Sequence, residues 1–360
     1  MHRRQFLRIS KACAVGSVLG CFATAPLPEA PVDEQIYTCS YDAEVFALGE
    51  SSDPYQTVWN ESRSDQTTDI QLDRNHDVLI CNRGDGLEKW SHGASRPQLR
   101  WRYDGLSSSI RGISVDKHND YYLGSWNEHG FHKIVEVDNE PRRAWEYTWS
   151  GDDGMIVSAP RRTGEVAVGL KNNEVHLISE REGEPHRHWC WTPKTGEIIR
   201  ELLWGPDDEL YIGCEDHVLY KLIDTGPKAT PSVEWTYDSE NIIFGASRTP
   251  DGDIYIATNA GEVHYIRDED GTPKRQWVYH HTTPDDPVPT DDYWWDGLVH
   301  QVAVRRDNSE LYSCSYDGTV HRIVEEDGQP VTDWEFDAHT DNVREVRIQY
   351  EALGTWPEKW

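Results

Sequence analysis

The sequence has few of the patterns that hold a metal, a haem or a helical core. Its 360 residues include seven cysteines, yet none is adjacent to another and none forms C-x-x-C or C-x-x-C-H, the spacings typical of zinc, redox and c-type haem sites. No stretch has the sustained periodicity of an amphipathic helix. These absences argue against a cysteine-based metal or haem centre and against a mainly helical fold.

Lysine is also scarce, with ten lysines against 25 arginines and a formal net charge of −29. No basic stretch could neutralise phosphates, so the sequence predicts no nucleic-acid binding. High acid content with little lysine is typical of proteins that work in strong salt, where screening is short-ranged, and we interpret it as haloarchaeal. The alternative, an acidic face for a basic partner, predicts clustered acids, whereas these are spread over every turn.

A tryptophan recurs seven times along the chain at a nearly constant interval. The spacings are 42, 44, 44, 46, 42 and 57 residues, and six of the seven units have a second aromatic residue two positions later. The seven are Trp59, Trp101, Trp145, Trp189, Trp235, Trp277 and Trp334. A fixed period of this size indicates a repeat architecture. Because the tryptophan takes one position in each repeat, we interpret the set as structural and not as a binding stripe.

Each repeat is predicted to be a four-stranded antiparallel meander. In the unit from Ile242 to Tyr279, four β-rich runs of four to seven residues are separated by clusters of Gly, Pro and Asp, which indicate short strands and tight turns. One position of every second strand accepts small residues alone: Cys39, Cys81, Gly124, Gly169, Gly213, Ala257 and Cys314. We expect tight packing of sheet on sheet there. The three cysteines, on separate blades, should be buried and too far apart for disulfides.

Seven such repeats predict an all-β, seven-bladed β-propeller with four antiparallel strands per blade. The chain enters at a second strand, at Ile36, and ends on an unaccompanied first strand, Val343–Gln349. We therefore expect the C-terminal strand to join the N-terminal blade and close the ring, which removes two exposed sheet edges. The propeller should span residues 36–350, with a C-terminal tail at 351–360.

Individual units resemble known propeller repeats. Residues 254–279 (IYIATNAGEVHYIRDEDGTPKRQWVY) are similar to PQQ-like, quinoprotein-type repeats, with a small-residue strand, a Gly turn and a final Trp-x-aromatic. The last unit, LYSCSYDGTVHRIVEEDG followed by AHTDNVREVRI, resembles a WD-repeat as much. The resemblance spans roughly Ile36 to Gln349. It implies the architecture and no particular activity, because fold does not determine function.

The N-terminus resembles an export signal. The motif RRQFL at residues 3–7 is similar to a twin-arginine signal, and a weakly apolar stretch follows at 12–19. At about eight residues this stretch is too short to span a bilayer, which takes roughly 20. The motif VLGC, ending at Cys21, resembles a lipobox and predicts lipidation of that cysteine.

These motifs predict a signal at residues 1–20, a Pro- and acid-rich tether at 21–35, and a lipid-anchored protein at the cell surface, on the outer face of the cytoplasmic membrane. Two alternatives remain open. One is cleavage after Ala25, which the following Pro26 disfavours, and the other is a cytoplasmic protein with a chance arginine pair.

One aligned position near the start of the first strands, called the column below, is rich in basic residues. Aligning these strands brings seven residues to one position: Thr68, Arg111, Met155, Arg200, Phe244, His300 and Arg344. Four of the seven are Arg or His, although acids outnumber Lys plus Arg by 64 to 35. We expect Arg111, Arg200, His300 and Arg344 to ring one mouth of the channel and bind a carboxylate, sulfate or phosphate. The alternative is that the arginines pair with neighbouring acids such as Asp69, Glu201 and Glu345.

The 57-residue interval contains a second candidate site. Residues 280–297 (HHTTPDDPVPTDDYWWDG) make a loop about thirteen residues longer than its counterparts, and long loops are usually functional or disordered. Tyr293, Trp294 and Trp295 could stack on a sugar or aromatic ligand or contact a partner; alternatively they fold the loop back onto its blade. The loop's His and Asp residues could bind a cation, but its prolines and acidic background favour a solvated loop, so no metal site is predicted.

The leading hypothesis is a non-catalytic binding module. It is a monomeric, exported propeller that docks a protein partner or a small anionic or sugar ligand at its loop-rich mouth, touches the membrane through its lipid anchor alone, and has no resident cofactor. The support is the anchor and the lack of a recognisable catalytic set.

The alternative is an enzyme acting on an anionic or sugar substrate. The resemblance to quinoproteins implies a dehydrogenase with PQQ and calcium, yet those enzymes usually have eight blades, and some place adjacent cysteines at the cofactor. An arylsulfotransferase-like propeller would use a catalytic His among arginines, and His300 with Arg111, Arg200 and Arg344 is the nearest match. A glycan lyase or hydrolase using the Trp294-Trp295 loop is also open.

Overall fold

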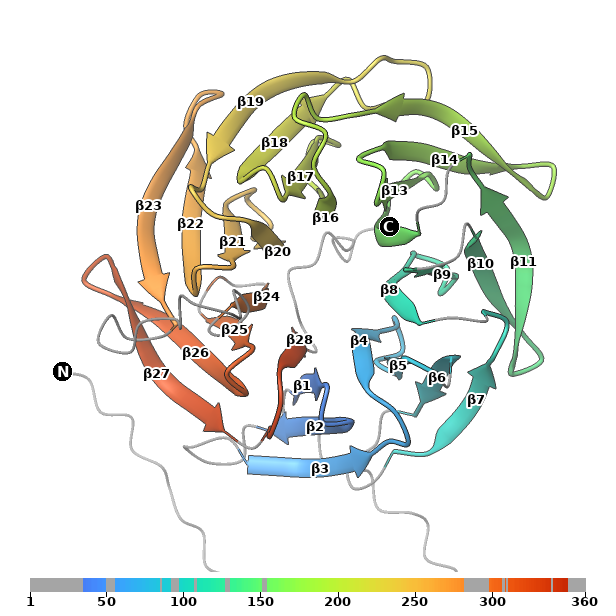
Figure 1. Ribbon diagram of the computed structural model, residues 1–360, viewed down its shortest axis with the longest axis horizontal. Coiled ribbons are helices and arrows are strands. Elements are labelled where there is room, and N and C mark those ends of the chain that lie inside the picture. Colours follow the sequence, from blue (N-terminus) through green and yellow to red (C-terminus); the bar gives the residue numbers. More distant parts are fainter. Residues whose placement is uncertain are drawn as a thin grey trace, which may run out of the picture. The chain divides into compact units, whose positions relative to one another are not determined.

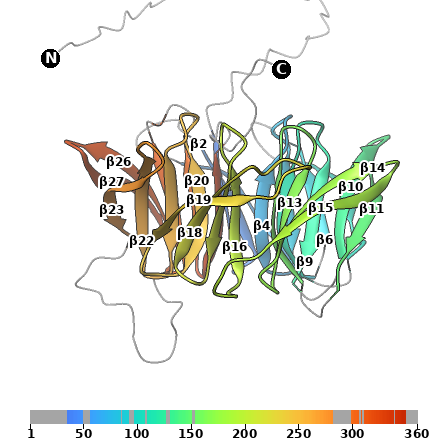
Figure 2. The same cartoon turned by 90° about the horizontal axis from the view of Figure 1, so that it is seen from above.

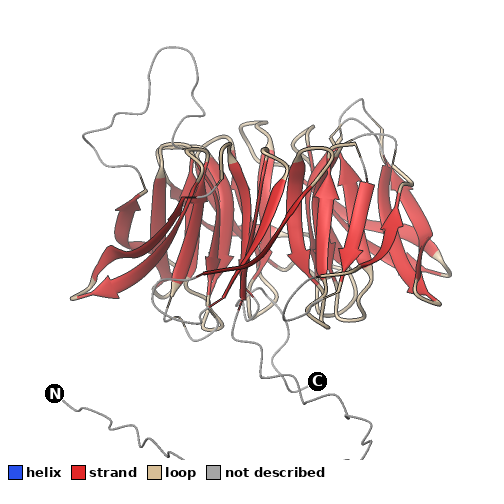
Figure 3. Cartoon of the chain, turned by 90° about the horizontal axis from the view of Figure 1, so that it is seen from below, coloured by secondary structure: helices blue, strands red, loops and turns tan. Residues whose placement is uncertain are grey.

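The described part of the chain consists of strands and turns. The computed structural model describes residues 35–49, 56–84, 86–91, 97–106, 109–126, 130–150, 154–281, 298–305, 308, 310–337 and 339–348. Within these ranges the chain forms 28 β-strands, and no helix is long and apolar enough to cross a membrane (Figure 3). The all-β prediction is confirmed.

The strands form seven four-stranded antiparallel sheets arranged as blades around a ring (Figure 1). The innermost strands are β4 (Thr67–Leu72), β8 (Ile110–Val115), β12 (Met155–Pro160), β16 (Ile199–Trp204), β20 (Ile243–Arg248), β24 (Val299–Val304) and β28 (Val343–Ile348). The second strands are β1 (Gln35–Ser40), β5 (Val78–Asn82), β9 (Tyr121–Ser125), β13 (Val166–Leu170), β17 (Leu210–Cys214), β21 (Ile254–Thr258) and β25 (Leu311–Ser315).

The outer half of each blade continues the meander (Figure 2). The third strands are β2 (Glu44–Gly49), β6 (Gly86–Trp90), β10 (Gly130–Val137), β14 (Val175–Arg181), β18 (Val218–Ile223), β22 (Glu262–Asp268) and β26 (Thr319–Glu326). The outermost strands are β3 (Gln56–Ser62), β7 (Leu99–Tyr103), β11 (Glu140–Thr148), β15 (Glu184–Trp191), β19 (Ser232–Asp238), β23 (Pro273–His280) and β27 (Gln329–Asp337). The seven-bladed prediction is therefore confirmed.

The C-terminal strand closes the ring as expected. Strand β28 pairs antiparallel with β1, and the sheet order is β28-β1-β2-β3. His339, just before β28, has its Nε2 2.8 Å from Thr38 Oγ1 of β1 and its Nδ1 3.3 Å from an Asp42 carboxylate oxygen. Both ends of the propeller are thus held by side chains as well as by the strand ladder.

The core of the propeller lies between blades. Each of seven buried apolar clusters combines residues of two neighbouring blades. The small-residue position explains how they pack: a Cβ on Gly169 would lie 2.8 Å from Ile199 Cγ2 of the next blade, and one on Gly213 2.7 Å from Ile243 Cγ2. Such distances leave no room for a larger side chain. The cysteines at this position, Cys39, Cys81 and Cys314, are buried free thiols.

The recurrent tryptophans fasten each blade to the next. All seven lie in outermost strands with 6–8% of their surface exposed. Trp145 Nε1 donates to Glu180 Oε2 in β14 of the following blade at 3.1 Å, and Trp235 Nε1 donates to Asp268 Oδ2 in β22 at 2.9 Å. This burial and bonding support the structural interpretation of the tryptophans.

The aromatic residue two positions later makes a second link to the next blade. Tyr147 Oη lies 2.9 Å from His176 Nδ1, and Tyr237 Oη lies 2.9 Å from His264 Nδ1. Equivalent contacts join Tyr103 to His132 and Tyr279 to His321. The repeated histidines of the third strands therefore have structural partners in the preceding blade.

Candidate functional site: the cationic mouth of the channel

A β-bulge in every innermost strand positions the residues of the predicted column. Ile110 pairs with Ser125 and Gly112 with Gly124, which leaves Arg111 unpaired between them. A bulge bends the strand and re-aims the extra side chain. The equivalent unpaired residues are Thr68, Arg111, Ile156, Arg200, Phe244, His300 and Arg344. The column placed Met155 one residue too early, because Met155 itself pairs with Leu170.

Five of these residues line one cavity in the centre of the ring. The cavity has a volume of about 200 Å³, and its lining includes Arg111, Arg200, Phe244, His300 and Arg344. The structure thus brings the four predicted cationic or histidine side chains together. Thr68 differs, since its hydroxyl donates to the carbonyl of Ile110 in the next blade at 2.7 Å.

A second column of side chains, which the sequence analysis missed, completes the mouth. It consists of the residues that directly follow the second strands: Tyr41, Arg83, Trp126, Lys171, Glu215, Asn259 and Tyr316. Each has its backbone N–H bonded to a carbonyl just before the innermost strand of its own blade, as from Tyr316 to Leu298 at 2.9 Å. In the sequence these residues always stand two positions after the small residue. This constant offset is the sequence pattern from which the second column could have been predicted.

Two arginines of the mouth are bonded to tyrosines. Arg111 Nη1 donates to Tyr41 Oη at 3.0 Å, and Arg344 Nη1 donates to Tyr316 Oη. The Arg344 guanidinium also lies 4.9 Å from the centre of the Tyr41 ring. Among the described residues, neither arginine forms an ion pair with a carboxylate. Tyr41 follows β1 whereas Arg111 lies in β8, so this contact bridges blades that are not neighbours in the ring.

Arg200 is the arginine that has an acidic partner. Its Nε donates to Glu215 Oε1 at 2.8 Å, and its guanidinium lies 5.0 Å from the Phe244 ring. Trp126 is surrounded by cations, with the charged groups of Lys171, Arg111 and Arg200 at 4.3, 5.0 and 5.6 Å from its ring. A cation over an indole face is attracted by the ring quadrupole, so Trp126 helps to hold these like charges together.

His300 is a neutral ring among the cations. Burial lowers the pKa of its imidazole well below the ordinary value, and Arg344, Arg200 and Arg111 lower it further. The ring lies parallel to Tyr316 with centroids 5.7 Å apart. Its buried Nδ1 has no hydrogen-bond partner among the described residues, and the same holds for Nε of Arg111 and of Arg344.

The arginines change the acidity of Tyr41 in the opposite direction from burial. Burial alone raises the pKa of the Tyr41 hydroxyl, but Arg344 and Arg111 outweigh it and the net pKa is lowered. A phenol that becomes more acidic inside a protein reports a strongly positive local potential. The Tyr41 hydroxyl therefore lies in a positive local potential, whereas at Tyr316 burial prevails and the pKa is raised.

Acids below the mouth do not pair with the column. Asp69 Oδ2 accepts a hydrogen bond from the backbone N–H of Ile113 at 2.8 Å, Glu201 Oε2 accepts one from Gln301 Nε2 at 3.2 Å, and Glu345 pairs with Arg347 at 2.8 Å. Burial raises the pKa of Asp69 to about 6 and that of Glu201 to about 7. The ion-pair interpretation therefore fails for the three named acids, and Arg200 pairs with a different one.

Several predicted site residues lie outside the described residues: Cys21, Tyr293, Trp294 and Trp295. Their roles stay predictions. His281, at the start of the long loop, is described and buried, with Nδ1 2.9 Å from Ser313 Oγ and Nε2 2.8 Å from Thr319 Oγ1. Both of its ring nitrogens have partners inside the blade, so His281 is part of the blade's packing and not of a solvated loop.

Comparison with known proteins supports the fold. No family model and no curated protein matches the sequence. A Lactobacillus plantarum protein of known structure has a TM-score of 0.74 and 10% identity, covering 88% of this chain and 99% of its own. The Pseudomonas aeruginosa periplasmic gluconolactonase has a TM-score of 0.70 and 9% identity, covering 88% and 98%.

The WD40 β-propeller domain of Doa1 is similar as well, with a TM-score of 0.64 and 13% identity over 83% of this chain and 91% of the domain. Identities this low establish the architecture alone. The protein is a seven-bladed β-propeller, and its function has to be argued from the mouth itself.

Proposed function

We propose that this protein is an exported, lipid-anchored cell-surface propeller that binds a small organic anion at the cationic mouth of its channel. One observation carries the proposal: Arg111 and Arg344 converge on a central cavity, bonded to tyrosines instead of carboxylates, in a chain of net charge −29. Like charges held together below the surface are unfavourable unless a counter-charge joins them. An anionic ligand supplies that counter-charge.

The lining favours an anion that also carries a flat or ring-shaped apolar part. Guanidinium groups bind carboxylate, sulfate or phosphate through two parallel hydrogen bonds, and Arg111 and Arg344 both line the cavity. Trp126 and Phe244 add aromatic surface to the same cavity. A volume of about 200 Å³ suits a small molecule, so a protein partner would have to insert a single side chain.

Binding can be measured by calorimetry at high and low salt with sulfate, gluconate, benzoate and 4-nitrophenyl sulfate as probes. We expect at least one to bind with one-to-one stoichiometry. Arg111→Met or Arg344→Met should weaken it about 10- to 100-fold, because a hydrogen bond to a charged group contributes about 1.5–3 kcal/mol. Arg83→Met is the control: it removes the same charge from the second column at the mouth, where Arg83 is exposed and bonded to Gln66.

Two results would contradict the anion site. One is absence of binding by all four probes. The other is an equal loss of affinity in Arg83→Met and Arg111→Met, which would indicate a general field effect instead of a defined site. If high salt abolishes the loss of probe affinity in Arg83→Met but not in Arg111→Met, the result would support the anion site, since screening removes long-range interactions first.

Export and anchoring rest on the RRQFL and VLGC motifs. We expect mass spectrometry of the protein from its native membrane to show an N-terminus at Cys21 carrying diacylglyceryl lipid. A chain that begins at Met1, or a Cys21→Ser variant that stays equally membrane-bound, would contradict this part and leave the anion site standing.

A catalytic alternative is favoured by His300. Its ring is neutral and lines the same cavity as the three arginines, as an arylsulfotransferase-like base or nucleophile would. Release of 4-nitrophenol from 4-nitrophenyl sulfate in the presence of phenol, lost in His300→Gln, would support sulfuryl transfer. Binding of the aryl sulfate without turnover would favour the binding module.

The residues that line the cavity fit only part of a quinoprotein cofactor site. PQQ is a planar tricarboxylate, and its charge suits Arg111, Arg344 and the aromatic rings. The calcium that accompanies it needs several oxygen ligands, whereas Asp69 and Glu201 hold backbone amides and Gln301. The residues present therefore fit the quinone better than its metal, and we derive no redox step from them.

A further inference from the structure

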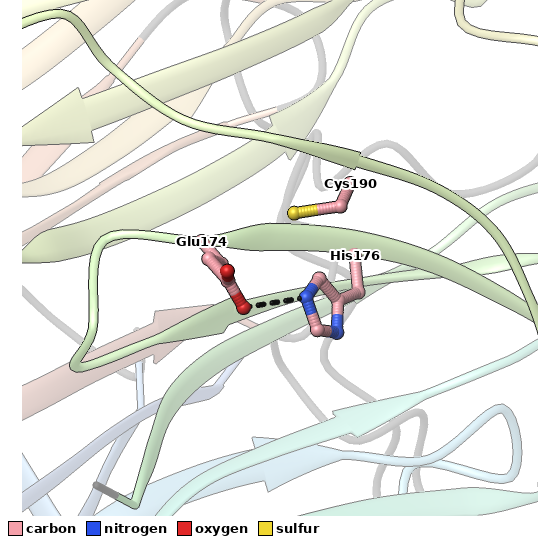
Figure 4. Close-up of side chains that lie close together, drawn as sticks. All are labelled: Glu174, His176 and Cys190. Atoms are coloured by element: carbon pink, nitrogen blue, oxygen red, sulfur yellow. Dashed lines mark hydrogen bonds and ion pairs between the residues drawn. The ribbon is translucent and has the colours of Figure 1, made fainter. Parts of the chain in front are cut away.

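The outer half of the β12–β15 blade carries a group of metal-ligating side chains that do not line the cavity at the channel mouth. Glu174 precedes β14, His176 lies in β14, and Cys190 lies opposite His176 in β15 (Figure 4). One donor atom of each side chain, a carboxylate oxygen, a ring nitrogen and the sulfur, lies within 4.8 Å of the other two. Within the described ranges this is the one group of three or more such residues. The sequence alone predicted no metal site.

The β20–β23 blade, called the sister blade below, has part of the same group and shows which contacts are structural. In the β20–β23 blade, Glu262 Oε2 lies 3.0 Å from His264 Nε2 and Tyr237 Oη lies 2.9 Å from His264 Nδ1. The corresponding distances around His176 are 2.9 and 2.9 Å. The carboxylate–histidine–tyrosine chain is thus a repeated structural unit, and it needs no metal.

At the position opposite the histidine, the two blades differ by a thiol. The residue opposite His264 is Val278, whereas the residue opposite His176 is Cys190. Among the five described cysteines, Cys190 is the exposed one, and the others are buried. The thiol therefore adds a third, soft donor to a carboxylate–imidazole pair that the fold already orients.

We propose that Glu174, His176 and Cys190 bind a thiophilic divalent cation of the Zn²⁺ type. One thiolate and one carboxylate balance the charge of the cation, and the imidazole completes three protein ligands with a fourth position left to water. When the metal binds, the Cys190 thiol proton leaves to solvent. The imidazole proton moves from Nε2 to Nδ1, where the Tyr147 hydroxyl oxygen accepts its hydrogen bond, the arrangement that orients histidine ligands elsewhere.

Metal binding requires the three ligand atoms to move closer together. Bond lengths of about 2.0–2.3 Å place tetrahedral ligands roughly 3.6 Å apart, so the widest pair here approaches by about 1 Å. Cys190 is exposed and Glu174 is half-buried, which leaves both side chains room to move. Arg187 Nη1, now 3.5 Å from His176 Nε2, has to swing away, and Arg187 is itself exposed.

Cobalt titration of the full-length chain tests the proposal, because a thiolate bound to Co²⁺ gives a charge-transfer band in the near ultraviolet. We expect one equivalent of Co²⁺ to produce the band and Zn²⁺ to abolish it by displacement. Cys190→Val, which copies the sister blade, should remove the band without changing the melting temperature of the metal-free chain. Glu174→Gln should weaken binding at least tenfold.

The sister blade also provides a gain-of-function test. Val278→Cys should create a second site with Glu262 and His264 and raise the stoichiometry from one to two. A wild-type chain without the band, a band that survives Cys190→Val, or a Val278→Cys chain that still binds one equivalent would overturn the proposal. Cys13 and Cys21 are present in every variant, so a band arising from them would survive Cys190→Val and count against the site.

Discussion

The inner and outer edges of each blade differ in how regularly they repeat. At the outer edge, Trp145 and Tyr147 bond to Glu180 and His176 of the next blade, and other blades repeat the same contacts. At the inner edge, the bulge position holds Thr, Arg, Ile, Arg, Phe, His and Arg in turn around the ring, and several of its buried polar atoms have no partner among the described residues. The contacts that repeat from blade to blade hold the blades together, whereas the residues that vary at the inner edge determine what the channel can bind.

Breaking the outer edge should have the largest effect. Trp145 is 6% exposed and donates to Glu180, so Trp145→Ala should lower the free energy of unfolding by about 3–5 kcal/mol through the cavity and the lost bond. Denaturant titration measures it. Leu99→Ala, at an exposed outer-strand position, is the control and should change the free energy by less than about 0.5 kcal/mol. Similar losses in both variants would remove the distinction.

Below the mouth, a buried acid should make stability depend on pH. The folded-state pKa of Glu201 is about 7, above the ordinary value of about 4.3, so its neutral form stabilises the fold below about pH 4.3 and this contribution is lost as the pH rises through 7. Glu201→Gln should therefore be more stable than the wild type at pH 8, by about 3.5 kcal/mol at most, with the advantage fading toward pH 4. The exposed Glu326→Gln is the control variant for pH-dependent unfolding. A Glu201→Gln difference that does not change with pH would contradict the assignment.

Removing one outer link without its packing should have a moderate effect. Tyr237→Phe deletes the hydroxyl bonded to His264 and keeps the ring, so unfolding should become easier by about 1 kcal/mol. Thermal unfolding of this variant can be compared with Tyr316→Phe at the inner edge. We expect the inner variant to alter anion binding more than stability, and the reverse ranking would break the comparison.

The smallest expected change concerns the charge of the mouth. Arg111→Met should leave the free energy of unfolding unchanged or raise it by about 0.5 kcal/mol at low salt, because it relieves repulsion from Arg344, and added salt should shrink the gain. Chemical unfolding at two salt concentrations measures this. A loss above about 2 kcal/mol would show that Arg111 is a structural residue of the ring.

Much of the fold could be predicted because each repeat has the same pattern of strand and turn residues. Turn clusters and alternating runs predicted the four strands, and the unaccompanied strand at Val343 predicted the closure with β1. The position of Gly169 predicted close packing between blades, and the Ile199 contact explains it. These features follow from spacing along the chain, so no long-range information was needed.

The candidate site was predicted in part. Alignment found Arg111, Arg200, His300 and Arg344, because they share one place in the repeat. It misplaced the member in β12 by one residue, since a bulge shifts the register without a signature in the sequence. Tyr41 and Trp126 were missed, although they stand at a constant offset from the small residue, because their relevance appears when different blades meet over the channel.

The amino-acid sequence by itself determined the number of blades, the strand order and the identity of the cations at the bulge, since all three depend on local pattern and period. The tertiary structure alone decided which charges remain uncompensated. Arg200 meets Glu215, whereas Arg111 and Arg344 meet tyrosines from other blades, and Cys190 meets a carboxylate–histidine pair that its sister blade leaves beside a valine. Charge balance and metal ligation depend on distances between side chains, and closure of the ring sets those distances.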